Sequence, residues 1–130
     1  MTGMPPNPGT RPLVVAIDDD PAVLSALTRL LDDERYDFIS TGDSDEALDI
    51  VRTRRVSLLL ADYRMPRLSG TGLLQVVKAT SPETIRLLLT AYPKATWVIR
   101  AAEMELMESV LEKPWDNDGL RATIRERLSL

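Results

Sequence analysis

Three consecutive aspartates, Asp18, Asp19 and Asp20, follow an apolar run from Leu13 to Ile17 and precede a proline that can begin a helix. A strand that ends in adjacent carboxylates concentrates negative charge in the loop before the helix. Carboxylates held this close repel one another unless a cation neutralises them, and hard divalent cations prefer carboxylate oxygens as ligands. The cluster therefore predicts a metal site at the end of the first strand.

Three later apolar segments also end in a residue that can do chemistry, namely Asp62, Thr90 and Lys113. In parallel α/β sheets, sites form outside the carboxyl ends of the strands, so these ends can converge although they lie far apart in sequence. With the first acidic cluster they supply metal ligands, a carboxylate nucleophile, a hydroxyl and a fixed positive charge. This set predicts transfer of a phosphoryl group onto a carboxylate.

The same residues resemble the receiver domain of two-component response regulators. The likeness rests on motifs that occur in the family's order and at nearly its spacing, over roughly residues 12 to 130. These motifs are the pair Asp18-Asp19, the segment Asp62-Tyr63-Arg64-Met65-Pro66 followed by Gly70, the pair Thr90-Ala91, and Lys113-Pro114 with Trp115.

The resemblance implies a role for each matching residue. Asp62 would accept the phosphoryl group, and Asp18, Asp19, Asp62 and the backbone carbonyl of Arg64 would bind Mg²⁺. Thr90 would donate its hydroxyl to a phosphoryl oxygen. Lys113 would pair with Asp62 before the reaction and with the phosphoryl oxygens after it, and the peptide bond before Pro114 would be cis. Asp20 is instead expected to cap the following helix, a position that favours carboxylates.

Two large residues are expected to set the lifetime of the phosphoryl group. Arg64 lies two positions after the acceptor Asp62, and Tyr92 lies two positions after Thr90. In receivers, the side chains at these two positions flank the route of the water that hydrolyses the phosphoryl group. A guanidinium can pair with phosphoryl oxygens and a ring can exclude water, so slow hydrolysis is expected.

One departure concerns the switch: receivers commonly have an aromatic residue three positions before the lysine, where this chain has Val110. The loop from Tyr92 to Lys94, the next helix and Trp97 are therefore expected to carry the conformational change.

Composition limits the partners and the compartment. The chain has 130 residues, 16 basic and 20 acidic, with a net charge of −4 and no cysteine or histidine. This size fits one domain, and the absence of a basic stripe argues against direct contact with nucleic acid. The sequence predicts a cytoplasmic protein without a membrane span. Because it lacks histidine, a phosphohistidine donor must be another protein, a histidine kinase or a histidine phosphotransfer protein.

Apolar periodicity predicts a βα unit repeated five times after a disordered, proline-rich leader at residues 1–12, with a receiver domain over residues 13–130. The expected strands are 13–17, 36–40, 56–61, 85–89 and 108–112. Helices are expected from Pro21, after a capping box at Asp43 and Glu46, and over about 69–79, 94–102 and 117–128. This pattern predicts a doubly wound parallel sheet, with the flavodoxin-like order 2-1-3-4-5 implied by the resemblance.

Some features have two interpretations. The apolar residues Trp97, Val98, Ala101, Met104, Leu106 and Met107 fit core packing or a surface that docks a partner. For the whole chain, one alternative is a pseudo-receiver that keeps the fold as an interaction module without the chemistry. Another is a phosphatase of the haloacid dehalogenase type, whose D-x-D-x-[TV] motif is matched by Asp18 and Asp20 but not by Ala22. The output that the domain controls stays open.

Overall fold

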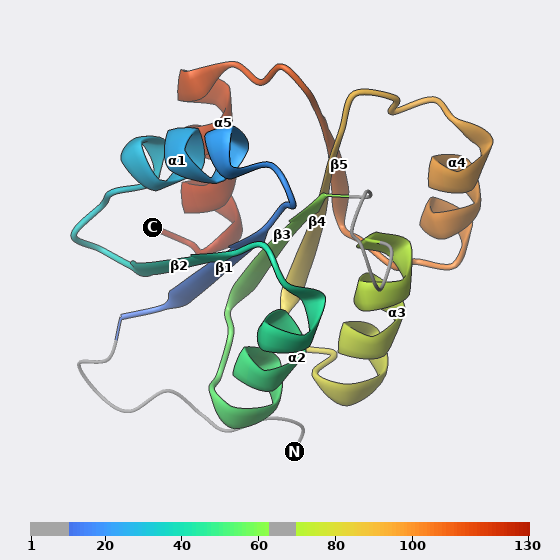
Figure 1. Cartoon of the computed structure of the whole chain (residues 1–130), viewed down its shortest axis with the longest axis horizontal. Coiled ribbons are helices and arrows are strands. Elements are labelled where there is room, and N and C mark those ends of the chain that lie inside the picture. Colours follow the sequence, from blue (N-terminus) through green and yellow to red (C-terminus); the bar gives the residue numbers. More distant parts are fainter. Residues whose placement is uncertain (1–10, 63–69) are drawn as a thin grey trace.

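Five parallel strands form one sheet in the order β2-β1-β3-β4-β5, with a helix after each strand (Figure 1). The computed structural model describes residues 11–62 and 70–130. Its strands are β1 (Leu13–Ile17), β2 (Asp37–Thr41), β3 (Leu58–Asp62), β4 (Ile85–Thr90) and β5 (Ser109–Glu112), and its helices are α1 (Pro21–Leu30), α2 (Ser44–Thr53), α3 (Gly70–Thr80), α4 (Thr96–Glu103) and α5 (Asn117–Arg127). The predicted doubly wound sheet and its strand order are confirmed.

Burial along the strands explains this order. Every residue of β1 and β3 is buried, as expected for central strands that helices cover on both faces. The residues of β2 and β5 are mostly half-buried, and these strands lie at the two edges. The apolar runs therefore occupy the middle of the sheet.

Helices cover the sheet in two layers, with α1 and α5 on one face and α2, α3 and α4 on the other (Figure 1). Alternate residues of the central strands supply the two cores. Val15 and Leu59 pack toward α2–α4, whereas Val14 and Leu60 pack toward α1 and α5. Each fully buried leucine stabilises the fold by roughly 1.5–3 kcal/mol relative to an exposed one. Both helix layers therefore stabilise the sheet and hold the ends of its strands in position.

Aspartates cap three of the helices. Asp20 accepts a hydrogen bond from the backbone N–H of Ala22 at the start of α1, which confirms the predicted cap. Asp43 caps α2, as predicted. The predicted capping box, in which Glu46 would accept a hydrogen bond from the N–H of Asp43, is wrong. The N–H of Asp43 donates instead to Thr41 Oγ1, 3.1 Å away, because the end of β2 already presents that hydroxyl. Asp116 caps α5.

Most element bounds differ by one or two residues from the prediction. Tyr36 is buried but precedes the ladder, which begins at Asp37 paired with Leu13. Ala95 is extended and forms the N-cap of α4, so this helix begins after the predicted Lys94. Residues 1–10 of the expected leader lie outside the described residues. Its last two residues contact β2: the guanidinium of Arg11 forms an ion pair with the Asp37 carboxylate, and the carbonyl of Pro12 accepts a hydrogen bond from the backbone N–H of Asp37.

The ambiguous apolar residues around α4 separate into two groups. Four of them, Val98, Ala101, Leu106 and Met107, are buried in the α2–α4 core, as the packing interpretation predicts. Trp97 is half-buried against the same core, and Met104 is 52% exposed.

Among the described residues, no helix is long and apolar enough to cross a membrane.

Candidate functional site

The register of the parallel strands brings the predicted residues to one edge of the sheet. Ile17, the last residue of β1, lies beside Ala61, so Asp18, which follows β1, and Asp62, which ends β3, are neighbours at the ends of adjacent strands. On the other side of Asp62, β4 ends at Thr90, which is paired with Glu112 of β5. Lys113 follows directly. Four strand ends thus converge, as the topological rule predicts.

Asp18 is the most tightly held member of the acidic cluster, with 1% of its surface exposed. Its backbone N–H donates to Thr41 O of β2, 3.2 Å away. Its Oδ1 accepts a bond of 2.9 Å from the N–H of Asp20, and its Oδ2 accepts one of 2.8 Å from Lys113 Nζ. These contacts orient the carboxylate before any ligand binds.

Three carboxylates fit a divalent cation. Oxygens of Asp18, Asp19 and Asp62 all lie within 4.8 Å of one another, two of the residues being buried and Asp19 exposed. A magnesium ion takes hard oxygen ligands and retains several waters, so a small carboxylate set open to solvent on one side suits it. Arg64, whose carbonyl is the fourth expected protein ligand, lies outside the described residues.

Lys113 bridges two carboxylates. Its Nζ lies 2.8 Å from Asp18 Oδ2 and 2.8 Å from Asp62 Oδ1. Burial alone would lower the pKa of this ammonium, but the hydrogen bonds to Asp18 and Asp62 outweigh it and raise the pKa above its usual 10.5. Lys113 therefore stays charged and partly neutralises the cluster. The peptide bond between Lys113 and Pro114 is cis, as the resemblance implied.

Thr90 places a hydroxyl at the end of β4. Its Oγ1 accepts a bond of 3.0 Å from the N–H of Tyr92, which leaves the hydroxyl proton to donate to another group. Its carbonyl accepts a bond of 2.9 Å from the N–H of Lys113. The threonine is thus tied both to the loop before α4 and to the strand that carries the lysine.

These residues line a cavity of about 340 Å³ at the carboxyl edge of the sheet. Its described lining comprises Asp18, Asp19, Asp20, Asp62, Thr90, Ala91, Tyr92, Trp97 and Lys113. The sequence did not place Trp97 at the site, since it lies on the first turn of α4 and nothing in its spacing marks it as a cavity residue. Val110, at the position where receivers commonly have an aromatic residue, does not line this cavity and packs, half-buried, against the α2–α4 core.

Comparison with known proteins shows what the chain is similar to. The family model of the response regulator receiver domain matches residues 14–125 of this chain. The chain is 31% identical over 113 residues to the hydrogenase transcriptional regulatory protein HoxA of Cupriavidus necator, covering 87% of this chain and 23% of that protein. It is 33% identical over 118 residues to the DNA-binding response regulator MtrA of Mycolicibacterium smegmatis, covering 91% and 51%. The chain thus spans about a quarter to a half of the curated relatives.

Solved structures agree. The signal receiver domain of an HD domain-containing protein from Pseudomonas fluorescens Pf-5 is 30% identical, with a TM-score of 0.84 over 92% of this chain and 88% of that one. A CheY-like response regulator receiver domain protein from Methanospirillum hungatei has a TM-score of 0.85 over 92% and 95%, at 22% identity. The second likeness concerns the fold alone.

Proposed function

This chain belongs to the response regulator receiver family, and from that premise we propose that Asp62 accepts a phosphoryl group from a phosphohistidine. The donor would be a histidine kinase or a histidine phosphotransfer protein. In the step, a carboxylate oxygen of Asp62 forms a bond to phosphorus while the P–N bond of the donor breaks. The imidazole leaves with the bonding electron pair and takes up a proton. The observation that carries this proposal is the bridge from Lys113 to both Asp62 and Asp18.

Lys113 and Thr90 would stabilise charge as the phosphoryl group transfers. The ammonium already lies 2.8 Å from Asp62 Oδ1, so it can follow the oxygens of a group attached there. Thr90 is 3% exposed and lines the same cavity, where its hydroxyl proton can be donated to a phosphoryl oxygen. Both residues would act on the product as well as on the transition state.

Magnesium fits the three carboxylates and would neutralise the phosphoryl charge when bound. Asp18 and Asp19 would hold it together with Asp62, and the carbonyl of Arg64 would add a protein ligand. The three carboxylates support this assignment because their oxygens lie within 4.8 Å of one another, whereas the role of Arg64 rests on the resemblance to the family. Asp18 lines the cavity, and each carboxylate oxygen has a further lone pair beyond the one that accepts from Lys113 or Asp20, with which it would bind the ion.

The proposed protein is a phosphoacceptor with at most weak self-phosphorylation from small donors and slow self-dephosphorylation. Tyr92 lines the cavity and is 59% exposed, so its ring lies at the mouth, where it can exclude water. Arg64, which lies outside the described residues, would act through its guanidinium by pairing with the phosphoryl oxygens. Together they would lengthen the lifetime of the phosphoryl group.

The group attached to Asp62 would alter α4 and thereby control an output. The relatives named above are transcriptional and DNA-binding regulators, and this chain carries a net charge of −4. Any contact with nucleic acid would therefore belong to an output domain or protein rather than to this domain. A cytoplasmic location follows from the proposed kinase partner.

The test uses acetyl phosphate with Mg²⁺ and intact-mass measurement. The native chain should gain one phosphoryl group, Asp62→Asn should gain none because an amide cannot attack, and the control Asp49→Asn, at an exposed residue of α2, should react like the native chain. Labelling that persists in Asp62→Asn would move the nucleophile to the first acidic cluster, as in the phosphatase alternative. A native chain that never reacts would be a pseudo-receiver.

A further inference from the structure

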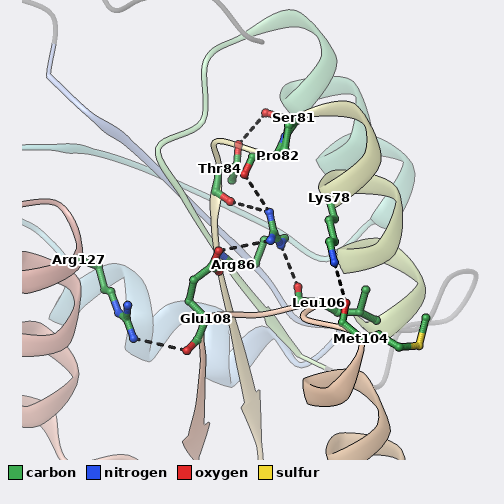
Figure 2. Close-up of polar contacts among 9 residues, drawn as sticks. All are labelled: Lys78, Ser81, Pro82, Thr84, Arg86, Met104, Leu106, Glu108 and Arg127. Carbon is green, nitrogen blue, oxygen red and sulfur yellow. Dashed lines mark hydrogen bonds and ion pairs between the residues drawn. The ribbon is translucent and has the colours of Figure 1, made fainter. Parts of the chain in front are cut away.

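A buried arginine lies near the start of β4, at the end of the sheet opposite the acidic site. Arg86 is the second residue of this strand and is 5% exposed. Its guanidinium donates to three backbone carbonyls, those of Pro82, Thr84 and Leu106, at 3.3, 3.1 and 2.9 Å (Figure 2). A buried charge needs such partners, and the proposed phosphoryl chemistry makes no use of this one.

Arg86 also exchanges hydrogen bonds with Glu108, the residue before β5. The backbone N–H of Arg86 donates to Glu108 Oε2, 2.6 Å away, and the backbone N–H of Glu108 donates to Arg86 O, 2.7 Å away. Nη2 of Arg86 lies 3.3 Å from Glu108 Oε1 (Figure 2). A carboxylate oxygen thus takes the place that a strand carbonyl has in a regular ladder.

A second arginine contacts the same segment from α5. Nη2 of Arg127 donates to Glu108 O, 3.5 Å away, and to the hydroxyl of Ser109 (Figure 2). The contact with Glu108 is long for a hydrogen bond, so Arg86 is the principal partner of the glutamate. We refer to Arg86 and Glu108 as the β5 anchor.

The strand that follows depends on this anchor because it is a short edge strand. β5 has four residues, Ser109–Glu112, and pairs only with β4. At its other end, the backbone N–H of Lys113 donates to Thr90 O, 2.9 Å away. Any residue except proline could make that backbone bond, so the bond does not determine which residue lies beside Thr90.

The contact of Glu108 with Arg86 does determine it. The neighbouring residues Met107 and Ser109 have no carboxylate, so in any other register of β5 the N–H and guanidinium of Arg86 would lose an acceptor that buried groups require. Lys113 lies five residues after Glu108, about 16 Å along an extended strand. No residue within two positions of Lys113 carries a positive charge, so a shift of register would remove the ammonium from the site.

We propose that Arg86 and Glu108 are positioning residues, which select the register of β5 and thereby place Lys113 Nζ between Asp18 and Asp62. The consequence for phosphoryl transfer rests on the proposed function. A misplacement of about 1 Å can slow a reaction by about 100-fold. Loss of the β5 anchor should therefore slow transfer onto Asp62 although neither anchor residue lines the site cavity.

Labelling by acetyl phosphate with Mg²⁺, followed by intact mass on the whole chain, measures this consequence. Glu108→Ala, assayed well below its Tm, should be labelled more slowly than the native chain by on the order of tenfold or more. Should this variant fail to fold, Glu108→Gln replaces it, because the amide keeps an oxygen for the N–H of Arg86 but loses the ion pair. The slowing should then be smaller but in the same direction.

Thr84→Val is the matched control. Thr84 is fully buried in the same polar network, and its Oγ1 donates to Val56 O, 2.7 Å away, on the β3 side of β4. The substitution keeps the shape of the side chain and removes this bond without contacting β5. It should lower Tm and leave the labelling rate at the native value.

A double-substitution cycle separates positioning from general destabilisation. Lys113→Met removes the group that the β5 anchor places, so adding Glu108→Ala to it should slow labelling no further. In metal-free buffer, the loss of Tm caused by Lys113→Met should be smaller in the Glu108→Ala chain than in the native chain. Effects of substitutions more than about 10 Å apart ordinarily add, so coupling between these two positions must pass along β5.

Exchanging two neighbouring residues tests whether the place of the carboxylate matters or only its charge. Glu108→Ser combined with Ser109→Glu keeps the composition and the net charge and moves the carboxylate by one position. Because the strand contact with Arg86 is lost, this chain should be labelled as slowly as Glu108→Ala.

Several results would overturn the positioning role. These are a native labelling rate in Glu108→Ala or in the exchanged chain, equal slowing in Thr84→Val, and rates that fall further when Glu108→Ala is added to Lys113→Met. A native chain that is never labelled would refute the proposed function. The metal-free cycle would then still decide about the β5 anchor, because additive losses of Tm reject it and a reduced loss supports it.

Discussion

Replacing Lys113 by methionine tests whether the ammonium is the internal counterion of the acidic cluster. Methionine keeps most of the side-chain length and removes the charge. Asp18 is 1% exposed and Asp62 is 8% exposed, and each accepts a bond of 2.8 Å from Lys113 Nζ. Without the lysine, both buried carboxylates lose a partner that solvent replaces only partly.

The magnitude follows from these distances. At 2.8 Å and an effective dielectric constant of about 20, each contact has a gross attraction of about 6 kcal/mol, most of which desolvation offsets. Removing one partner of a buried pair costs about 3–5 kcal/mol. The lysine side chain is 22% exposed, so the lower end applies, and we expect a loss of about 3 kcal/mol, or about 10 °C in Tm.

Chemical denaturation with and without Mg²⁺ measures the effect. In metal-free buffer Lys113→Met should lose this stability, whereas Lys94→Met, an exposed lysine outside the cavity lining, should change by less than about 0.5 kcal/mol. Magnesium should stabilise Lys113→Met more than the native chain, because it replaces the missing charge. A metal-free loss below about 1 kcal/mol, or equal stabilisation of both chains by magnesium, would refute the counterion role.

The dependence of this difference on pH has a definite sign. The hydrogen bonds to Asp18 and Asp62 raise the pKa of Lys113 above its usual 10.5 in spite of burial. A group with a raised folded-state pKa contributes stability that is complete below the unfolded value and is lost as pH rises through the folded value. The difference between the native chain and Lys113→Met should therefore be constant at neutral pH and shrink in strong alkali.

Three further outcomes are expected. Arg64→Ala and Tyr92→Ala should each shorten the lifetime of the phosphorylated protein, measured by intact mass over time, and unchanged lifetimes would reject shielding. With beryllofluoride and Mg²⁺, the fluorescence change should vanish in Trp97→Phe and persist in Trp115→Phe; the reverse would exclude α4 as the moving element. The hydrogen bond from Arg35 is the main factor that holds the pKa of Asp33 well below its usual 3.8. Its stabilisation is lost as pH falls, so Asp33→Asn should lower Tm at neutral pH but not in strong acid.

The alternation of strands and helices, and the residues at the strand ends, can be predicted from the amino-acid sequence alone. Apolar runs of strand length, separated by helical spacing, follow from the different periods of the two structures. Since parallel strands place their carboxyl ends at one edge, the positions of Asp62, Thr90 and Lys113 could be predicted to converge. Their chemical roles remain predictions that the labelling experiments test.

Which side chains contact one another depends on the three-dimensional packing and could not be predicted from the sequence. Lys113 contacts Asp18 across 95 residues and Asp62 across 51, and such pairs depend on strand register and on how each helix packs. Arg86 is a single charged residue within the apolar strand β4. The sequence around it does not indicate which groups its guanidinium contacts. Trp97 was recognised as part of an apolar stripe, but that it lines both the site cavity and a groove between α3 and α4 follows from the position of α4 over the sheet. Sequence periodicity specifies a face of a helix, whereas the partner of that face is set by packing in three dimensions.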